Sequence, residues 1–328
     1  MALDAYVTRV IPQPGIDLLR EHLTVTVNEG DQQLSADELK KYASSQDALM
    51  TLLTDRIDRA VLEAGHGRLK IVANVAVGYD NVDVDAASEL GILVTNTPGV
   101  LTETTADFAW ALLMGIARRT AEAQAYLRAG KFQGWGIMLM LGEDVFGKTL
   151  GLVGYGRIGR AVAKRASGFD MTVQYYDPVI SEEDAQALLP ARQVDLDTLL
   201  RTSDFVSVHT PLIPETTHLI GAAEFASMKS TAYLINTSRG PVLDEAALAD
   251  ALAANTIRGA ALDVFEREPE VEPRLMELDN VLITPHIASA TVATRTRMAT
   301  MAAENVIAGL GGERPPSAVN FDEVTRRG

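Results

Sequence analysis

The chain has 328 residues, no cysteine and a formal net charge of −15. Its length exceeds the size at which one hydrophobic core usually stops growing, and its composition (47% hydrophobic, 22% charged) is that of folded globular proteins, so two domains are expected. The acidic balance disfavours nucleic acid as a partner, and the lack of cysteine excludes disulfides, thiolate nucleophiles and cysteine-based zinc or iron–sulfur sites; no metal site is predicted.

The residues from Met1 to Tyr6 contain no basic stretch followed by an apolar run, so they do not resemble a signal peptide. No apolar run reaches the roughly 18 residues that are needed to span a bilayer. We therefore expect no membrane association and a cytoplasmic location.

The first third of the chain alternates short β-rich runs with amphipathic helical patterns. The expected strands are Ala5–Val10, Thr24–Val27, Asp47–Leu53, Leu69–Val75 and Ile92–Thr95, with helical patterns between them at Gly15–His22, Ala36–Tyr42 and Val84–Leu90. Such alternation predicts a parallel sheet with helices on its faces, but it does not give the order of the strands.

A long helix is expected next, from Leu101 to about Gly130. It begins with a threonine-rich stretch, 102–105, whose hydroxyls suit the free N–H groups of a helix start. Its middle is apolar on nearly every side, so we expect it to be buried between domains or between subunits.

A second alternating series begins at Thr149 and ends in a helical pattern. Its expected strands are Thr149–Val153, Thr172–Tyr176, Phe205–Val208, Ala232–Asn236, Gly259–Val264 and Val281–Thr284, and the last helix is expected at Thr291–Leu310. The predicted fold class is therefore α/β, with two doubly wound parallel sheets and a ligand cleft between them.

A glycine motif follows the first strand of this second series and precedes a helical pattern. It reads Gly154-Tyr155-Gly156-Arg157-Ile158-Gly159. In this context G-x-G-x-x-G predicts a dinucleotide-binding turn, because its glycines permit a tight turn, close approach of a pyrophosphate, and close packing of helix on strand. Free N–H groups at the helix start would hold the anion. Taken alone, the pattern is equally compatible with a purely structural turn.

Asp177 ends the next strand, where a carboxylate can accept hydrogen bonds from the adenosine ribose of NAD. An aspartate before a proline also favours a turn. No lysine or arginine lies between Arg165 and Arg192, whereas the same stretch carries Asp177, Glu182, Glu183 and Asp184. A 2′-phosphate would be repelled there unless a basic group came from elsewhere in the fold, so we predict NAD as cofactor, with NADH preferred over NADPH.

A nicotinamide site would serve the reduction, by hydride, of a carbonyl beside a carboxylate. This reaction needs a cation that binds the carboxylate and an acid that protonates the carbonyl oxygen. Of the five histidines, His209 and His286 follow apolar strands, at the edge where open α/β sheets bind ligands. Either is also compatible with an ordinary strand-end histidine. Arg239 follows a third strand, and its planar fork of donors suits a carboxylate, although a surface arginine in a turn has the same pattern.

Several motifs occur together in the order and approximate spacing of the D-2-hydroxyacid dehydrogenase family, which the chain resembles over nearly its whole length. They are the glycine motif, Val77–Asn81, Asn96–Val100, Asn236–Gly240, Ala261–Pro269 and Thr284–Ser289. The resemblance implies an NAD-dependent oxidoreductase that transfers a hydride between NAD(H) and C2 of a small 2-oxo or 2-hydroxy acid.

The resemblance also implies roles for individual residues. Arg239 would bind the substrate carboxylate and carbonyl, His286 would be the acid/base, and Glu268 would hold His286 in its protonated form. The backbone N–H groups of Val77 and Gly78 would meet the substrate carboxylate. Near the cofactor or substrate the family implies Thr104, Thr210, Pro211, Thr216, Thr237, Ser238, Asp263, His286 and Ser289.

In this family the substrate domain is formed by both ends of the chain, and a Rossmann-type cofactor domain is inserted between them. The resemblance implies a flavodoxin-like substrate domain at residues 1–99 and 287–328 and an NAD-binding domain at residues 100–286. It further implies a homodimer. Trp135 is similar to an aromatic residue that, in glyoxylate reductases, reaches a neighbouring subunit's site.

Within the family, Leu52–Asp58 and Asn96–Asp107 are most similar to glyoxylate/hydroxypyruvate reductases, which implies reduction to glycolate or D-glycerate. Glu268 argues against a formate dehydrogenase, which usually has glutamine there. A D-lactate enzyme, a short phosphoglycerate dehydrogenase and a phosphite dehydrogenase remain alternatives. From another class, an NAD-sensing corepressor or scaffold shares the fold and also remains an alternative.

Overall fold

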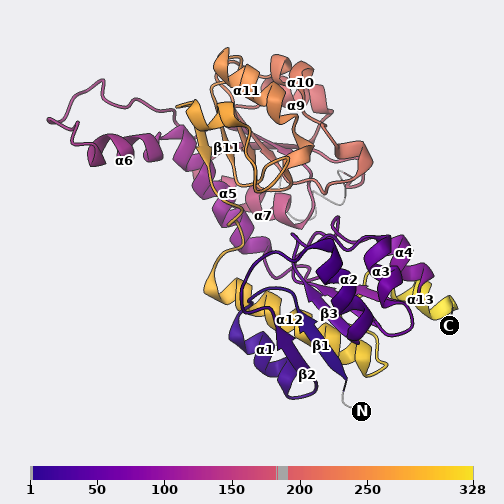
Figure 1. Ribbon diagram of the computed structural model, residues 1–328. Helices are drawn as coiled ribbons and strands as arrows, with labels where there is room; N and C mark the ends of the chain where they lie inside the picture. Colours follow the sequence, from indigo (N-terminus) through magenta and orange to yellow (C-terminus); the bar gives the residue numbers. More distant parts are fainter. Residues whose placement is uncertain (1–2, 182, 184–190, 328) are drawn as a thin grey trace. The chain divides into compact units, whose positions relative to one another are not determined.

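The computed structural model describes residues 3–181, 183 and 191–327 (Figure 1). The chain folds into two compact units, one made of Met1–Leu101 with Ala290–Gly328 and the other of Thr102–Ser289. The expected domain boundaries differ from these bounds by a few residues. Residues 287–289, expected with the substrate domain, fold with the second unit because the carboxylate of Asp263 in that unit accepts the N–H groups of Ile287 and Ala288.

The first unit is built on a five-stranded parallel sheet with the order β2-β1-β3-β4-β5. Its strands are β1 (Asp4–Val7), β2 (Thr24–Val27), β3 (Ala48–Thr51), β4 (Ile71–Asn74) and β5 (Leu93–Thr95). Its helices are α1 (Gln13–Arg20), α2 (Ala36–Ser45), α3 (Arg59–Gly65), α4 (Val84–Glu89), α12 (Val292–Leu310) and α13 (Phe321–Arg327).

Helices cover both faces of this sheet because its strands are apolar on both faces. Alternate residues of β1 face opposite cores: Ala5 and Val7 pack with α1 and α12, whereas Tyr6 packs with α2, α3 and α4. Side chains fix where these helices begin, since Asp58 and Asp83 accept N–H groups from the first turns of α3 and α4.

The second unit is built on a seven-stranded parallel sheet with the order β12-β11-β10-β9-β6-β7-β8. Its strands are β6 (Thr149–Val153), β7 (Thr172–Tyr176), β8 (Arg192–Gln193), β9 (Phe205–Val208), β10 (Tyr233–Asn236), β11 (Gly259–Leu262) and β12 (Val281–Ile283). Its helices include α5 (Thr102–Ala117), α6 (Thr120–Arg128), α7 (Arg157–Ala166), α9 (Leu196–Thr202), α10 (Ala222–Ser227) and α11 (Glu245–Ala253). The predicted fold class, two doubly wound parallel α/β sheets, is confirmed.

The prediction of a single helix from Leu101 to about Gly130 is wrong, because this stretch forms two helices, α5 and α6. Arg119 has a left-handed φ of 53°, and its guanidinium pairs with Glu122 at 2.6 Å. Helix α5 packs with α7 against one face of the sheet. Helix α6 buries none of its residues and extends away from the seven-stranded sheet (Figure 1). Among the described residues, no helix is long and apolar enough to cross a membrane.

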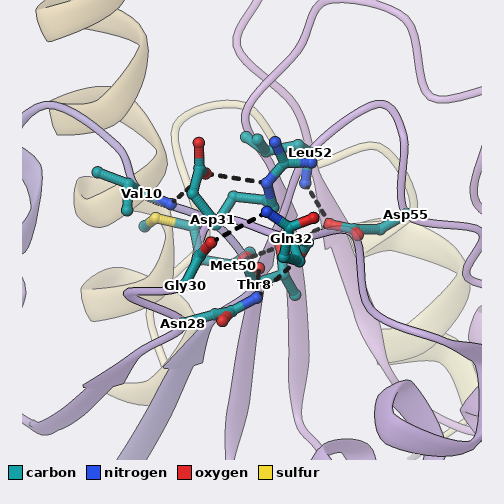
Figure 2. Close-up of polar contacts among 10 residues, drawn as sticks. Thr8, Val10, Asn28, Gly30, Asp31, Gln32, Met50, Leu52 and Asp55 are labelled. Carbon is teal, nitrogen blue, oxygen red and sulfur yellow. Dashed lines mark hydrogen bonds and ion pairs between the residues drawn. The ribbon is translucent and has the colours of Figure 1, made fainter. Parts of the chain in front are cut away.

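In the first unit the strand order reverses between β1 and β3, the kind of point where open α/β sheets bind ligands. A fully buried carboxylate, Asp55, joins the ends of these two strands (Figure 2). Its Oδ2 accepts the Leu52 N–H at 2.8 Å and the Thr8 hydroxyl at 2.5 Å, whereas its Oδ1 has no partner among the described residues. Burial raises the pKa of Asp55, against the opposing effects of both hydrogen bonds and the nearby charge of Arg9.

This burial predicts how the free energy of unfolding depends on pH. Because the folded-state pKa of Asp55 is raised, the native protein holds this proton to a higher pH than the unfolded chain does, and stability falls as pH rises through that interval. Asp55→Asn removes this penalty. In urea unfolding, the stability of the variant relative to the parent is therefore expected to be higher at pH 7.5 than at pH 4.

Asp31 provides a control of opposite sign on the same edge. Its carboxylate accepts Arg9 Nε at 2.9 Å, and this hydrogen bond lowers the pKa of Asp31. Asp31→Asn should therefore cost more stability at pH 7.5 than at pH 2.5, because the ionised carboxylate stabilises the native state fully above the unfolded pKa of 3.8 and this stabilisation is lost as pH falls through the lowered folded-state pKa. A pH-independent effect of Asp55→Asn would contradict the burial argument.

Candidate active site

The carboxyl end of β10 presents Arg239 through a turn held by a buried amide. The Asn236 Oδ1 accepts the N–H of Ser238 at 3.0 Å and its hydroxyl at 2.8 Å, while Nδ2 donates to the Arg239 carbonyl at 2.9 Å. Asn236 is fully buried, so the turn is held by a side chain inside the protein, whereas Arg239 is partly exposed. The guanidinium is thus carried on a preorganised turn, which suits recognition of an anion.

The structure pairs the two predicted residues Glu268 and His286. His286 Nδ1 lies 2.9 Å from Glu268 Oε2, and Glu268 Oε1 accepts the Phe265 N–H at 3.0 Å. Burial by itself raises the pKa of Glu268, but the hydrogen bond and charge of His286, the Phe265 N–H and the charge of Arg239 outweigh it, so this pKa lies below its usual range. The pair is therefore an ionised carboxylate that holds an imidazole through a hydrogen bond and orients its ring.

Asp263 holds the segment that carries His286. This carboxylate is fully buried at the end of β11: Oδ1 accepts the Thr284 hydroxyl at 2.6 Å and the Ile287 N–H at 2.9 Å, and Oδ2 accepts the Ala288 N–H at 2.7 Å. His286, between these contacts, has a left-handed φ of 54°. Both carboxylate oxygens of Asp263, predicted from the resemblance to line the nicotinamide pocket, are thus bonded to the segment around His286.

The glycine motif forms the turn between β6 and α7. Gly154 has φ +95°, and a Cβ there would lie 2.8 Å from the His209 carbonyl carbon; a Cβ at Gly159 would overlap the Gly154 carbonyl. At Gly156, the N-cap of α7, a Cβ would meet no atom, and no side chain caps the helix. Among the described residues, no side chain thus caps the first N–H groups of α7, those of Arg157 and Ile158, which fits the pyrophosphate of a dinucleotide.

Two buried hydroxyls give a second indication of a bound group. Thr210 and Thr237 follow β9 and β10, are 8% exposed, and their Oγ1 atoms have no partner among the described residues. Buried hydroxyls usually have a partner, so the carboxyl edge of this sheet fits a polar ligand such as a nicotinamide dinucleotide. Directly before Thr210 in the chain, His209 Nε2 lies 2.9 Å from Ser207 Oγ, and burial lowers the pKa of His209 to about 3.

Asp177 serves both as a turn former and as a support of the glycine motif. Its carboxylate accepts the N–H groups of Tyr155 at 2.8 Å, Val179 at 2.8 Å and Ile180 at 3.0 Å. A carboxylate has further lone pairs, so these bonds leave it able to accept a ribose hydroxyl.

A pocket of about 600 Å³ lies at this end of the sheet. Its lining is Tyr176, Asp177, Pro178, Arg192, Gln193, Val194, Asp195 and Thr198. Arg192 on β8 thus lines the same pocket as Asp177. It is a basic group that reaches this pocket from elsewhere in the fold. Glu182 and Asp184, which the sequence argument counted, lie outside the described residues; Glu183 is exposed.

The other predicted cofactor residues lie at the starts of helices or the ends of strands in the same unit. Thr104 is in the first turn of α5, and Ser238 is bonded to Asn236. Pro211 and Thr216 lie at the two ends of a short turn after β9, where the Thr216 hydroxyl donates to the Pro211 carbonyl at 2.7 Å. Ser289 is the last residue of the unit.

The predicted substrate loop, Val77 and Gly78, belongs to the first unit and follows β4. Two asparagines that sequence reasoning left without a role bond to its carbonyls: Asn96 Nδ2 donates to Val77 O at 2.7 Å, and Asn74 Nδ2 to Gly78 O at 3.0 Å. Both lie at strand ends, a signal that the sequence already contained.

Comparison with known proteins gives the family. The family model for the D-isomer specific 2-hydroxyacid dehydrogenase, NAD binding domain, matches residues 110–288. A glyoxylate reductase of Korarchaeum cryptofilum (strain OPF8) is 52% identical over 324 residues, which cover 98% of this chain and 97% of the relative.

Two solved structures are similar over nearly the whole chain. The TT0316 protein of Thermus thermophilus has a TM-score of 0.91 at 45% identity, covering 97% of this chain and 100% of that chain. An NADPH-dependent glyoxylate/hydroxypyruvate reductase of Sinorhizobium meliloti, in complex with NADP and malonate, has a TM-score of 0.86 at 32% identity, covering 97% of both chains. The chain therefore belongs to the D-isomer specific 2-hydroxyacid dehydrogenases, nicotinamide-dependent oxidoreductases, as its motifs predicted.

Proposed function

We propose that this chain reduces glyoxylate and hydroxypyruvate to glycolate and D-glycerate with NADH. The observation that carries the proposal is the bonded pair of Glu268 and His286, at the edge that also carries Arg239, in a chain 52% identical to a glyoxylate reductase. A cation, an imidazole and a carboxylate are the groups that reduction of a 2-oxo acid requires.

Each group has a role set by its chemistry. Arg239 binds the substrate carboxylate and the carbonyl oxygen through its fork of donors. His286 donates a proton to the carbonyl oxygen as charge develops there, and Glu268 favours the protonated imidazole before that step. When bound, the nicotinamide supplies the hydride. Val77 and Gly78 of the first unit bind the substrate carboxylate, so the first unit is the proposed substrate domain. Ser289, the last residue of the second unit, is also proposed to lie near the substrate.

The cofactor proposal combines the glycine turn with Asp177. The residues that would hold the dinucleotide are the turn itself, the start of α7, and the side chains that follow β9 and β10, including Thr210 and Thr237. Asp177 favours a ribose hydroxyl and repels a 2′-phosphate, whereas Arg192 in the same pocket attracts it. We infer that Asp177 dominates, because its carboxylate is anchored at the turn while Arg192 is exposed.

A homodimer is proposed from the surface of α6 and the segment after it. Apolar side chains are exposed there: Leu127, Phe132, Trp135, Ile137, Met138 and Leu141. A large exposed apolar set favours a protein interface, and a second copy of the chain would bring the same set to it. Trp135, 82% exposed, is proposed to reach the partner's site. The cytoplasmic location expected from the sequence stays a prediction.

The function is tested by oxidation of NADH with glyoxylate, hydroxypyruvate and other short 2-oxo acids. His286→Ala should lower kcat about 100-fold or more while the affinity for NADH changes little, because the imidazole donates a proton only as the reaction proceeds. His218→Ala is the matched control, since His218 forms a similar pair with Glu266 at 3.1 Å and has no role in the proposed reaction. NADH binding without oxidation by any of these acids would favour a sensor instead of an enzyme.

Cofactor preference is tested by steady-state kinetics with NADH and NADPH. The native chain should prefer NADH. Asp177→Ala should weaken NADH binding and lower the ratio of kcat/KM with NADH to kcat/KM with NADPH by roughly tenfold. Arg192→Ala should widen the preference, because it removes the cation near the 2′-phosphate. A native preference for NADPH would refute the electrostatic argument.

Sedimentation measures the proposed assembly. The native chain is expected to sediment as a dimer, and Ile137→Asp together with Met138→Asp should give monomers, because the charges cannot be buried without partners. Trp135→Ala should retain the dimer and lower activity. A native monomer would rule out this role for the segment.

A further inference from the structure

Three successive carbonyl groups of the substrate loop are bonded into the first unit. The Ala76 carbonyl accepts the Thr97 N–H at 2.8 Å, and the carbonyls of Val77 and Gly78 accept the amides of Asn96 and Asn74. All three bonding partners come from the ends of neighbouring strands, β4 and β5. The loop is therefore tied to the sheet at every carbonyl from residue 76 to residue 78.

The peptide geometry then determines where the N–H groups point. These peptides are trans, so each N–H is antiparallel to the carbonyl of the same peptide unit. The N–H groups of Val77, Gly78 and Tyr79 consequently point away from the asparagines, and none of them donates to an atom in the described part of the chain. Val77 and Gly78 are half-buried and Tyr79 is exposed, so a ligand can reach them.

The side-chain network leaves the Asn74 amide little freedom to turn. Asn74 is fully buried; its Oδ1 accepts the Thr51 hydroxyl at 3.1 Å, and its Nδ2 donates to Asn81 Oδ1 at 3.0 Å as well as to Gly78. Asn81 Nδ2 in turn donates to the carbonyls of Leu52 and Asp55. Thus the loop orientation is connected through a chain of hydrogen bonds to the β1 and β3 ends shown in Figure 2.

We propose that Asn74 and Asn96 are positioning residues that hold three successive N–H groups, those of Val77, Gly78 and Tyr79, as a binding site for the substrate carboxylate. Successive N–H groups on one side of a chain form an anion-binding concavity without any cation. This inference rests on the proposed function for the identity of the anion, a 2-oxo acid, and adds the side chains that shape its site.

The proposal separates binding from the chemical step. A carboxylate carries the same charge in the substrate and in the transition state, so its N–H contacts stabilise both about equally. Loss of a positioning amide should therefore raise KM and leave kcat nearly unchanged. His286 should behave in the opposite way, because its proton is transferred during the reaction.

The test compares Asn96→Ala, Asn96→Asp and Asn74→Ser with the native chain. Asn96→Ala should raise KM for glyoxylate roughly tenfold, since hydrogen bonds to a charged group are weakened, with kcat and NADH affinity nearly unchanged. Calorimetric titration of the NADH-bound protein with oxalate should show a similar loss of affinity. Asn96→Asp should have a larger effect, because it replaces a donor with a negative charge.

Asn320→Ala is the matched structural control. Asn320 is a buried asparagine of the same unit that makes three comparable hydrogen bonds, to Val94, Ser88 and Ile92, and none to the substrate loop. It should lower the free energy of unfolding and leave KM unchanged. Equal KM values for Asn96→Ala and Asn320→Ala would overturn the proposal. If Asn74→Ser does not fold, the variants of the half-buried Asn96 alone test the proposal.

The oxalate titration separates this inference from the proposed function. A native chain that binds oxalate but reduces no 2-oxo acid would refute the proposed function, while the effect of Asn96→Ala on oxalate affinity would still decide the role of the asparagines. A native chain that neither binds oxalate nor reduces any 2-oxo acid would overturn both.

Discussion

The position of His286 depends on one buried carboxylate, that of Asp263. Its two oxygens bond to the Thr284 hydroxyl before the histidine and to two N–H groups after it. These contacts hold residues on both sides of a histidine with a left-handed backbone, and Glu268 then holds the ring. The imidazole is therefore fixed by bonds to the backbone around it as well as by its own partner, which is the preorganisation that proton transfer needs.

The same device recurs at the carboxyl edges of both sheets. Asn236 holds the turn of Arg239, Asp177 holds the glycine turn, and Asn74 holds the loop of Gly78. Loops at a sheet edge leave backbone groups that must find partners, and short polar side chains at strand ends supply them. Polar residues at these positions thus shape the loops, and exposed N–H groups or longer side chains are left to meet the ligand.

Local patterns predicted much of the fold and part of the site. The strands of both series were found near their predicted positions, because apolar runs of that length between helical patterns are typical of parallel sheets. The break at Arg119 was missed, since no glycine or proline marks it and the left-handed residue is stabilised by its bond to Glu122. The two-residue strand β8 was also missed, and with it the position of Arg192 beside Asp177.

By itself the sequence determined the α/β class, the two series of strands, the glycine turn and, through its ordered motifs, the family. The tertiary structure alone decided the order of the strands, the triple bonding of Asp263, the anchoring of Val77 and Gly78, and the approach of Arg192 to Asp177. The physical reason is separation along the chain. Helix and strand patterns arise from neighbouring residues, whereas Asp263 and Ala288 meet only after two parallel strands have paired across a crossover.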